Sequence, residues 1–141
     1  MNQLIFIGGM SRSGATMLGN ILDSHPEIAC GPDTGIIDEI AYLYLTLISA
    51  IRSGRTSHYA SEEQVRTTIA TMIRGVYASY GVKKGKRIVV DRTPNNIWSF
   101  SILAELLPEA KFIHLIRDGR DVACSQRDVG ERLRAAGHDI T

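Results

Sequence analysis

The stretch LIFIGGMSRSGATML, from Leu4 to Leu18, decides the fold. It opens with a continuous apolar run, which is typical of a strand buried on both faces of a parallel sheet. A loop rich in glycine and serine follows, and after it apolar residues recur at helical spacing. A strand, a tight loop and a helix in this order direct several backbone N–H groups and the positive end of the helix dipole at one anion.

The loop from Gly9 to Thr16 has the spacing of a phosphate-binding loop, GxxxxGK[ST], with Ala15 in place of the lysine. The geometry for holding a phosphate group is retained, whereas the cation that neutralises the outer phosphates of a nucleoside triphosphate is missing. Arg12, inside the loop, is the candidate substitute. Taken alone, the same residues would equally suit an ordinary tight turn between a strand and a helix.

The composition indicates one globular domain. The 141 residues, 44% of them hydrophobic and 22% charged, suffice for one core but not for two, so we expect a single domain over residues 1–141. A formal net charge of +1 gives no overall basic surface, which argues against a nucleic acid partner. If Met1 is the start of the protein, no targeting segment is expected, and the apolar stretch 41–51 is too short to cross a membrane.

The two cysteines, Cys30 and Cys124, form no disulfide framework and do not have the spacing of zinc ligands. We interpret them as small buried residues in a reducing, cytoplasmic setting, and we expect no metal site.

Strand-like and helix-like segments alternate along the chain. Residues 87–90 and 111–116 are further apolar runs, and residues 27–30 are a candidate short strand. Helical spacing marks residues 14–23, 36–52, 61–80 and 97–107 and a last helix through Ser125, with a basic surface turn at 81–86. This alternation predicts an α/β fold, an open parallel sheet flanked by helices. Ligands of such sheets bind beyond the carboxyl ends of the strands, so the polar clusters after the three clear strands should share one edge.

A second anion site is expected after the strand at 111–116. Arg117 stands where that strand ends, and Ser125 follows eight residues later, about two helical turns on. An arginine and a serine in this arrangement could hold one phosphate by charge and by a hydrogen bond. Together with the first loop, they suggest a nucleotide that carries phosphates at both ends of its ribose.

The pair of segments FIGGMSRSGATML and FIHLIRDGRDVACS resembles the signature of the sulfotransferases that use 3′-phosphoadenosine 5′-phosphosulfate (PAPS). The runs RSGAT, LDSHPEIACG and RDGR are similar to the tyrosylprotein-sulfotransferase-like branch. The resemblance implies a P-loop NTPase-like sulfotransferase fold, incomplete at its C-terminus because relatives continue well past the second motif. It also implies PAPS as co-substrate, no metal, and a hydroxyl-bearing acceptor that is a small molecule or a peptide.

The resemblance also implies a role for each matched residue. Asp33 would be the general base, and Arg92 would lie close to the oxygen that bridges the sulfate, with Arg12 as a further catalytic cation. Cys30 would be a free thiol, because the position of its usual partner is Val90. The nucleotide would be bound at its 3′-phosphate by Arg117 and Ser125 and at its 5′-phosphosulfate by Arg12, Ser13, Gly14, Ala15 and Thr16.

Four positions depart from that branch. Asp33 replaces a glutamate, Arg92 replaces a lysine, and Ala15 lacks a hydroxyl that the branch usually offers. Gly35 stands where the tyrosine-sulfating enzymes place an arginine near the peptide, which weakens the case for protein tyrosine as acceptor.

Simpler interpretations stay open for several residues. Asp33 could cap the following helix, and Arg92 could pair with Asp91. Arg120 is expected to form a surface ion pair, and His114 to be a core histidine whose hydrogen bonds are satisfied. Asn95 and Asn96 are expected to start a helix rather than to bind a ligand.

Three functions are consistent with these features. The first is sulfuryl transfer from PAPS to an acceptor hydroxyl. The second is a nucleotide kinase or triphosphatase, against which Ala15 and the lack of an acidic magnesium strand argue. The third is a truncated nucleotide-binding remnant without turnover. The oligomeric state is not predicted.

Overall fold

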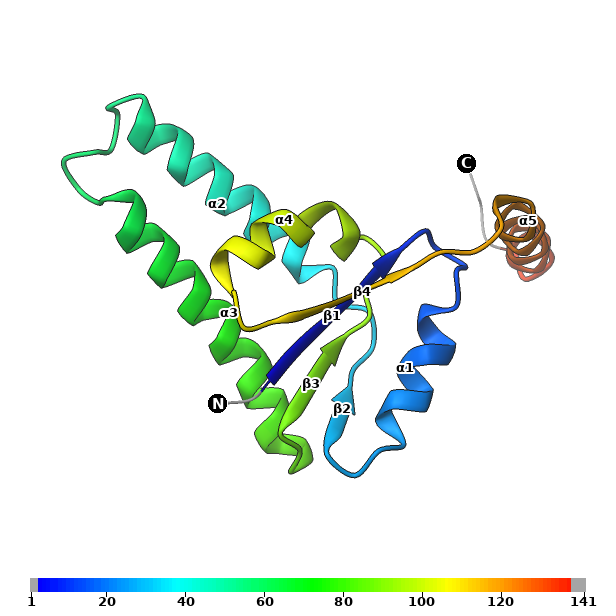
Figure 1. The fold of residues 1–141 in the computed structure, drawn as a ribbon. Helices are drawn as coiled ribbons and strands as arrows, with labels where there is room; N and C mark the ends of the chain where they lie inside the picture. Colours follow the sequence, from blue (N-terminus) through cyan, green and yellow to red (C-terminus); the bar gives the residue numbers. More distant parts are fainter. Residues whose placement is uncertain (1–2, 138–141) are drawn as a thin grey trace.

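The computed structural model describes residues 3–137, in which strands and helices alternate along the chain (Figure 1). The sequence pattern therefore predicts the order of the elements correctly. Their bounds are β1 (Gln3–Gly9), α1 (Ala15–Asp23), β2 (Ile28–Cys30), α2 (Ile36–Arg52), α3 (Glu62–Lys84), β3 (Ile88–Asp91), α4 (Asn96–Leu106), β4 (Lys111–Leu115) and α5 (Gly119–Ala135).

The strands form one open parallel sheet in the order β2-β3-β1-β4. The strand β1 lies between β3 and β4, and its apolar side chains Leu4, Phe6 and Ile7 are buried. An all-parallel sheet explains the continuous apolar runs, because helices cover it on both faces. The prediction of an α/β fold with an open parallel sheet is confirmed, and the short candidate strand is β2.

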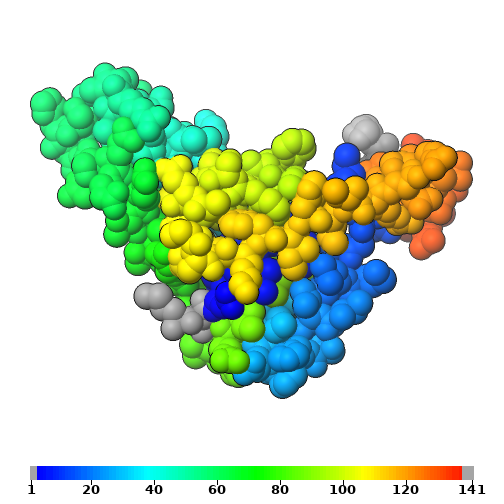
Figure 2. Space-filling model, in the orientation of Figure 1, coloured from blue at the N-terminus to red at the C-terminus, as the bar shows by residue number. Residues whose placement is uncertain are grey.

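Helices α2, α3 and α4 pack on one face of the sheet, and α1 packs on the other (Figure 1). The main core lies on the first of these faces. There the Phe6 ring meets the Tyr77 ring edge to face, with 5.7 Å between the ring centres, and it stacks on Phe112. Helices α2 and α3 continue past the sheet as a hairpin at one side of the molecule (Figure 2).

Helix α3 is longer than the sequence pattern suggested. Its predicted start is confirmed, since Ser61 and Gln64 form a reciprocal capping box. Its predicted end is wrong, because residues 81–84 are helical and the chain turns only at Gly85, which has a left-handed φ of 64°. The lysines at 83 and 84 suit a last turn, since they face the negative end of the helix dipole.

Helix α5 also continues past its predicted end near Ser125, as far as Ala135. Its side chains are mostly exposed, and Val122 is its buried residue. In Figure 1 the helix stands away from the layers that cover the sheet. The polar residues 130–135 are thus part of α5, and 138–141 lie outside the described residues.

Two predicted burials are wrong. Cys124 is exposed because it lies on the open surface of α5, and His114 is exposed because β4 is an edge strand with one strand neighbour. Within residues 3–137 we find no helix that combines the length and the apolar character of a membrane span.

Candidate functional site

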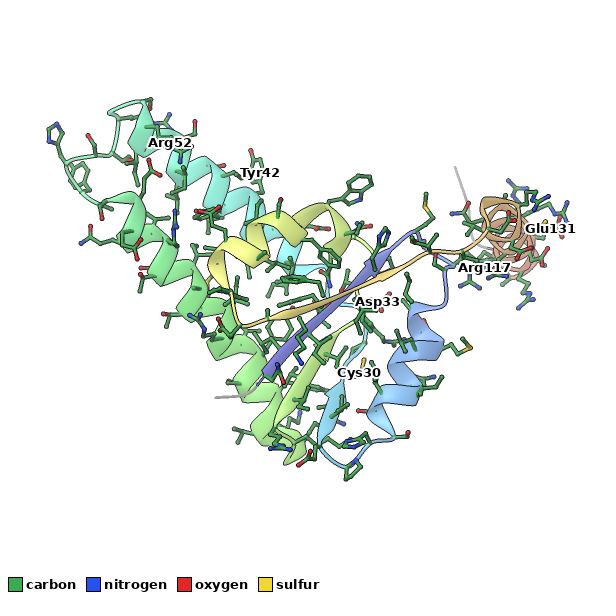
Figure 3. All side chains as sticks on the ribbon, in the orientation of Figure 1. Cys30, Asp33, Tyr42, Arg52, Arg117 and Glu131 are labelled. Carbon is green, nitrogen blue, oxygen red and sulfur yellow. The ribbon has the colours of Figure 1, made fainter. Side chains whose placement is uncertain are left out.

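A cleft of about 840 Å³ opens at the carboxyl end of β1. The loops after all four strands contribute to it, which confirms that the motifs share one edge of the sheet. Figure 3 shows Asp33 after β2 and Arg117 after β4, the two labelled residues that line it. The full lining is formed by Ser11, Arg12, Ser13, Gly14, Ala15, Thr16, Met17, Asn20, Asp33, Pro94, Arg117 and Ser125.

Glycines permit the close packing that shapes the first loop. A Cβ on Gly8 would lie 2.5 Å from the backbone N of Ile97, and one on Gly9 would lie 2.4 Å from the backbone O of Leu115. Gly14 precedes α1 with a left-handed φ of 105°, and no side chain among the described residues caps that helix. The first N–H groups of α1 are therefore available to an anion in the cleft.

The two predicted anion-binding motifs contact each other directly through Arg12. The Nε of Arg12 donates a hydrogen bond to Ser125 Oγ at 3.1 Å, and Arg117 Nη1 donates one to the backbone O of Arg12 at 2.9 Å. Arg12 has a φ of 71°, which is left-handed and unusual for a residue other than glycine. Contacts from residues more than a hundred positions away hold the loop in this conformation.

The structure separates the two arginines of the second motif. Arg117 lines the cleft, with its Nε 3.9 Å from Asp121. Arg120 pairs with Asp118 at 2.6 Å and does not line the cleft, so its interpretation as a surface ion pair is confirmed.

The donor set of the cleft fits a ligand with several anionic groups. It offers the guanidinium groups of Arg12 and Arg117 and the hydroxyls of Thr16 and Ser125. The Ser13 hydroxyl is buried and makes no hydrogen bond within residues 3–137, which is the state of a donor whose acceptor is a ligand oxygen. The residues present therefore suit PAPS.

Asp33 and Arg92 form a pair beside the cleft. Arg92 Nε lies 3.7 Å from Asp33 Oδ1 and donates a hydrogen bond to the backbone O of Gly31 at 2.8 Å. The Asp33 side chain is half exposed and lines the cleft, whereas the Arg92 side chain is 16% exposed and packs against Gly19 of α1. Arg92 therefore reaches the cleft through its contact with Asp33.

Two simpler interpretations are wrong. The residue that caps α2 is Gly35, without a side-chain hydrogen bond, so Asp33 is not a helix cap. Among the described residues, Arg92 pairs with the carboxylate of Asp33 and not with that of Asp91. Asn95 and Asn96 do stand at the start of α4, as predicted. The Asn96 side chain is also buried and donates hydrogen bonds to Ile7 O and Asp91 Oδ1.

Asp91 is a polar residue whose importance the sequence did not reveal. It is 3% exposed and accepts a hydrogen bond from the Tyr77 phenol. Burial, and next the charge of Asp91, raise the pKa of the Tyr77 phenol far above its usual range, so the phenol stays a donor. The sequence held one signal of this role, since Asp91 is an aspartate that directly ends a buried strand.

Cys30 is a free, partly buried thiol. This agrees with the family resemblance, because Val90 stands where the family has the cysteine that pairs with it. Burial raises the pKa of Cys30 to about 11, so its thiol is protonated and unreactive at neutral pH.

Residues 4–134 match the model of the sulfotransferase family. The chain belongs to this family. It is 32% identical to "Protein-tyrosine sulfotransferase 1" of Danio rerio over 98% of its own length and 38% of that relative. It is 33% identical to "Protein-tyrosine sulfotransferase 2" of Gallus gallus and 31% identical to "Protein-tyrosine sulfotransferase 1" of Homo sapiens, each over 97% of the chain and 36% of the relative.

Membership of the sulfotransferase family confirms the resemblance that the paired motifs predicted, and the open parallel sheet is consistent with the fold of that family. The chain spans less than two fifths of the length of these relatives. Across the described residues, no three His, Cys, Asp or Glu side chains gather as a metal site would require. The absence of a metal stays a prediction, as do the roles of the individual residues.

Proposed function

We propose that this chain transfers a sulfuryl group from PAPS to a hydroxyl-bearing acceptor. The observation that carries the proposal is the direct contact of the two anion-binding motifs through Arg12, which makes them one site. The family match supports it. A nucleoside triphosphate site would instead need the loop lysine that Ala15 replaces.

The two ends of the cleft suit the two charged ends of the nucleotide. The loop N–H groups, with Arg12, Ser13 and Thr16, would hold the 5′-phosphosulfate. Arg117 and Ser125 would hold the 3′-phosphate, and PAPS when bound supplies an activated sulfuryl group.

Asp33 would act as the general base in the transfer. Its carboxylate lines the cleft and could take the proton of the acceptor hydroxyl as that oxygen bonds to sulfur. In this transfer the bond between sulfur and the bridging oxygen would break, and the negative charge would pass to the nucleotide phosphate. Arg12 and Arg92 would stabilise that charge as permanent cations.

The relatives are named protein-tyrosine sulfotransferases, so a tyrosine peptide is the first acceptor to test. Gly35 lacks a side chain that could contact a peptide, so small alcohols and phenols are acceptors to test as well. The acceptor panel should therefore contain both classes. A cytoplasmic location stays a prediction.

Titration calorimetry with 3′-phosphoadenosine 5′-phosphate, against ADP and ATP, tests the nucleotide. We expect the compound with the 3′-phosphate to bind at least about tenfold more tightly, because Arg117 and Ser125 add charge-assisted hydrogen bonds worth about 1.5–3 kcal/mol. Tighter binding of ADP or ATP would instead indicate a kinase or triphosphatase.

A sulfate-transfer assay with Asp33→Asn tests the reaction. Loss of a general base should lower kcat by about 10²–10⁴-fold, with little change in nucleotide affinity. Asp128→Asn, an exposed carboxylate on α5, is the matched control and should leave kcat unchanged. Nucleotide binding without transfer to any acceptor would favour a binding remnant.

A further inference from the structure

Asp91 is a buried carboxylate whose hydrogen-bond partners are uncharged. Its Oδ1 accepts from the backbone N of Thr93 at 2.8 Å and from Asn96 Nδ2 at 3.0 Å. Its Oδ2 accepts from Thr34 Oγ1 at 3.0 Å and from the Tyr77 phenol. A buried charge is costly unless such bonds satisfy it, so this network holds its members in one geometry.

Three of these residues hold the backbone that directly follows Asp33. Thr93 Oγ1 accepts from the backbone N of Thr34 at 3.0 Å and from that of Gly35 at 3.4 Å. Asp91 holds the Thr34 hydroxyl, and Tyr77 ties Asp91 to the core through its ring contact with Phe6. We refer to Asp91, Thr93 and Tyr77 as the β3 clamp.

The backbone that precedes Asp33 is held by other residues. There, Gly31 O accepts from Arg92 Nε at 2.8 Å, while the Asp33 side chain is half exposed and ion-paired at 3.7 Å. The turn residue Gly35 has a φ of 65°, which glycine adopts without strain. The position of the Asp33 carboxylate therefore depends on hydrogen bonds made to its neighbours.

We infer that the β3 clamp positions Asp33 for proton transfer, so that Thr93 and Tyr77 control the rate without touching either substrate. This inference rests on the proposed role of Asp33 as general base. A displacement of about 1 Å at a reacting group can cost about a hundredfold in rate, so a small relaxation of this turn is enough to matter.

Two pairs of variants isolate the clamp. Thr93→Val removes the acceptor of both N–H groups at nearly constant volume, and Thr93→Ser keeps it. Tyr77→Phe removes one donor to Asp91, and Tyr44→Phe removes a tyrosine hydroxyl that donates to Glu105, outside the clamp. We expect kcat to fall at least about tenfold in Thr93→Val and Tyr77→Phe, and to stay near wild type in the two controls.

The affinity for 3′-phosphoadenosine 5′-phosphate should change less than about twofold in all four variants, because the clamp does not line the nucleotide cleft. A drop in affinity equal to the drop in kcat would mean general damage and would overturn the inference. Unchanged kcat in both Thr93→Val and Tyr77→Phe would overturn it as well.

Hydrogen exchange of the Thr34 and Gly35 amides provides a readout that needs no activity. Exchange should be at least about tenfold faster in Thr93→Val and unchanged in Thr93→Ser, since a lost acceptor frees both N–H groups. If the wild type neither binds the nucleotide nor transfers sulfate, the proposed function fails, and exchange still decides whether the clamp exists. Equal exchange in both variants would rule it out.

Discussion

Arg12 combines a strained backbone with two long-range contacts. A left-handed conformation costs a residue other than glycine about 1–2 kcal/mol. The contacts to Ser125 and Arg117 offset part of this cost. The loop is thus held in a conformation that its own sequence disfavours, as occurs at binding sites where geometry matters more than stability.

Arg12→Gly should separate stability from binding. Glycine relieves the backbone strain but loses a hydrogen bond worth about 0.5–1.5 kcal/mol, so we expect little change in Tm. Loss of the guanidinium should weaken binding of 3′-phosphoadenosine 5′-phosphate about tenfold or more, measured by calorimetry. Arg120→Ala, outside the cleft, is the control for loss of charge, and an equal loss of affinity there would contradict a specific role for Arg12.

Among the elements, α1 has a position where helix propensity and packing conflict. Gly19 is buried within the helix, and a Cβ there would lie 2.4 Å from Arg92 Cδ and 2.9 Å from Cys30 Sγ. The small residue is what lets Arg92 pass beneath α1 toward Asp33.

Gly19→Ala and Gly75→Ala should have opposite effects on stability. Gly75 is on the exposed side of α3 with no atom within 4 Å of an added Cβ, so alanine should stabilise the fold by about 0.5–1 kcal/mol. Gly19→Ala should destabilise it by about 1–3 kcal/mol, since the added methyl group overpacks the site. Urea unfolding measures both, and a stabilising Gly19→Ala would show that Arg92 moves freely.

For the whole molecule, surface carboxylates that join elements make stability depend on pH. A hydrogen bond from Arg87 lowers the pKa of Glu27, and this pair links the start of β2 to the start of β3. A hydrogen bond from Arg52 lowers the pKa of Glu62, and this pair links α2 to α3. The backbone N of Cys30, with smaller help from Lys86, lowers the pKa of Asp23 between α1 and β2.

These carboxylates predict unfolding toward acid. Because their pKa values are lower in the folded state, the unfolded chain binds more protons, and the stabilisation present above their usual values near 4 is lost as the pH falls. The urea midpoint should therefore decrease from about pH 6 to pH 3, less steeply in Asp23→Asn. A midpoint independent of pH would show that these pairs contribute nothing. Added salt should weaken the trend, since the pairs are largely exposed.

Features that are encoded locally were predictable from the sequence. The apolar runs at Leu4–Ile7 and at residues 111–116 predicted parallel strands, and the loop spacing around Gly14 predicted the loop that lines the cleft. Capping chemistry at Ser61 marked the start of α3 correctly. The predicted end of α5 was wrong, because most residues of this helix are polar and show little helical spacing of apolar residues.

By itself, the sequence determined the parallel sheet, the shared edge and the family, because strand periodicity and motif spacing depend on neighbouring residues. Only the tertiary structure decided that Arg12 joins the two motifs, that Arg92 pairs with Asp33, and that Asp91 anchors the turn beside Asp33. These contacts join residues that are far apart in the chain. They form only when the helices on both faces bury the sheet and bring its carboxyl-end loops together, and no local pattern records which side chains then meet.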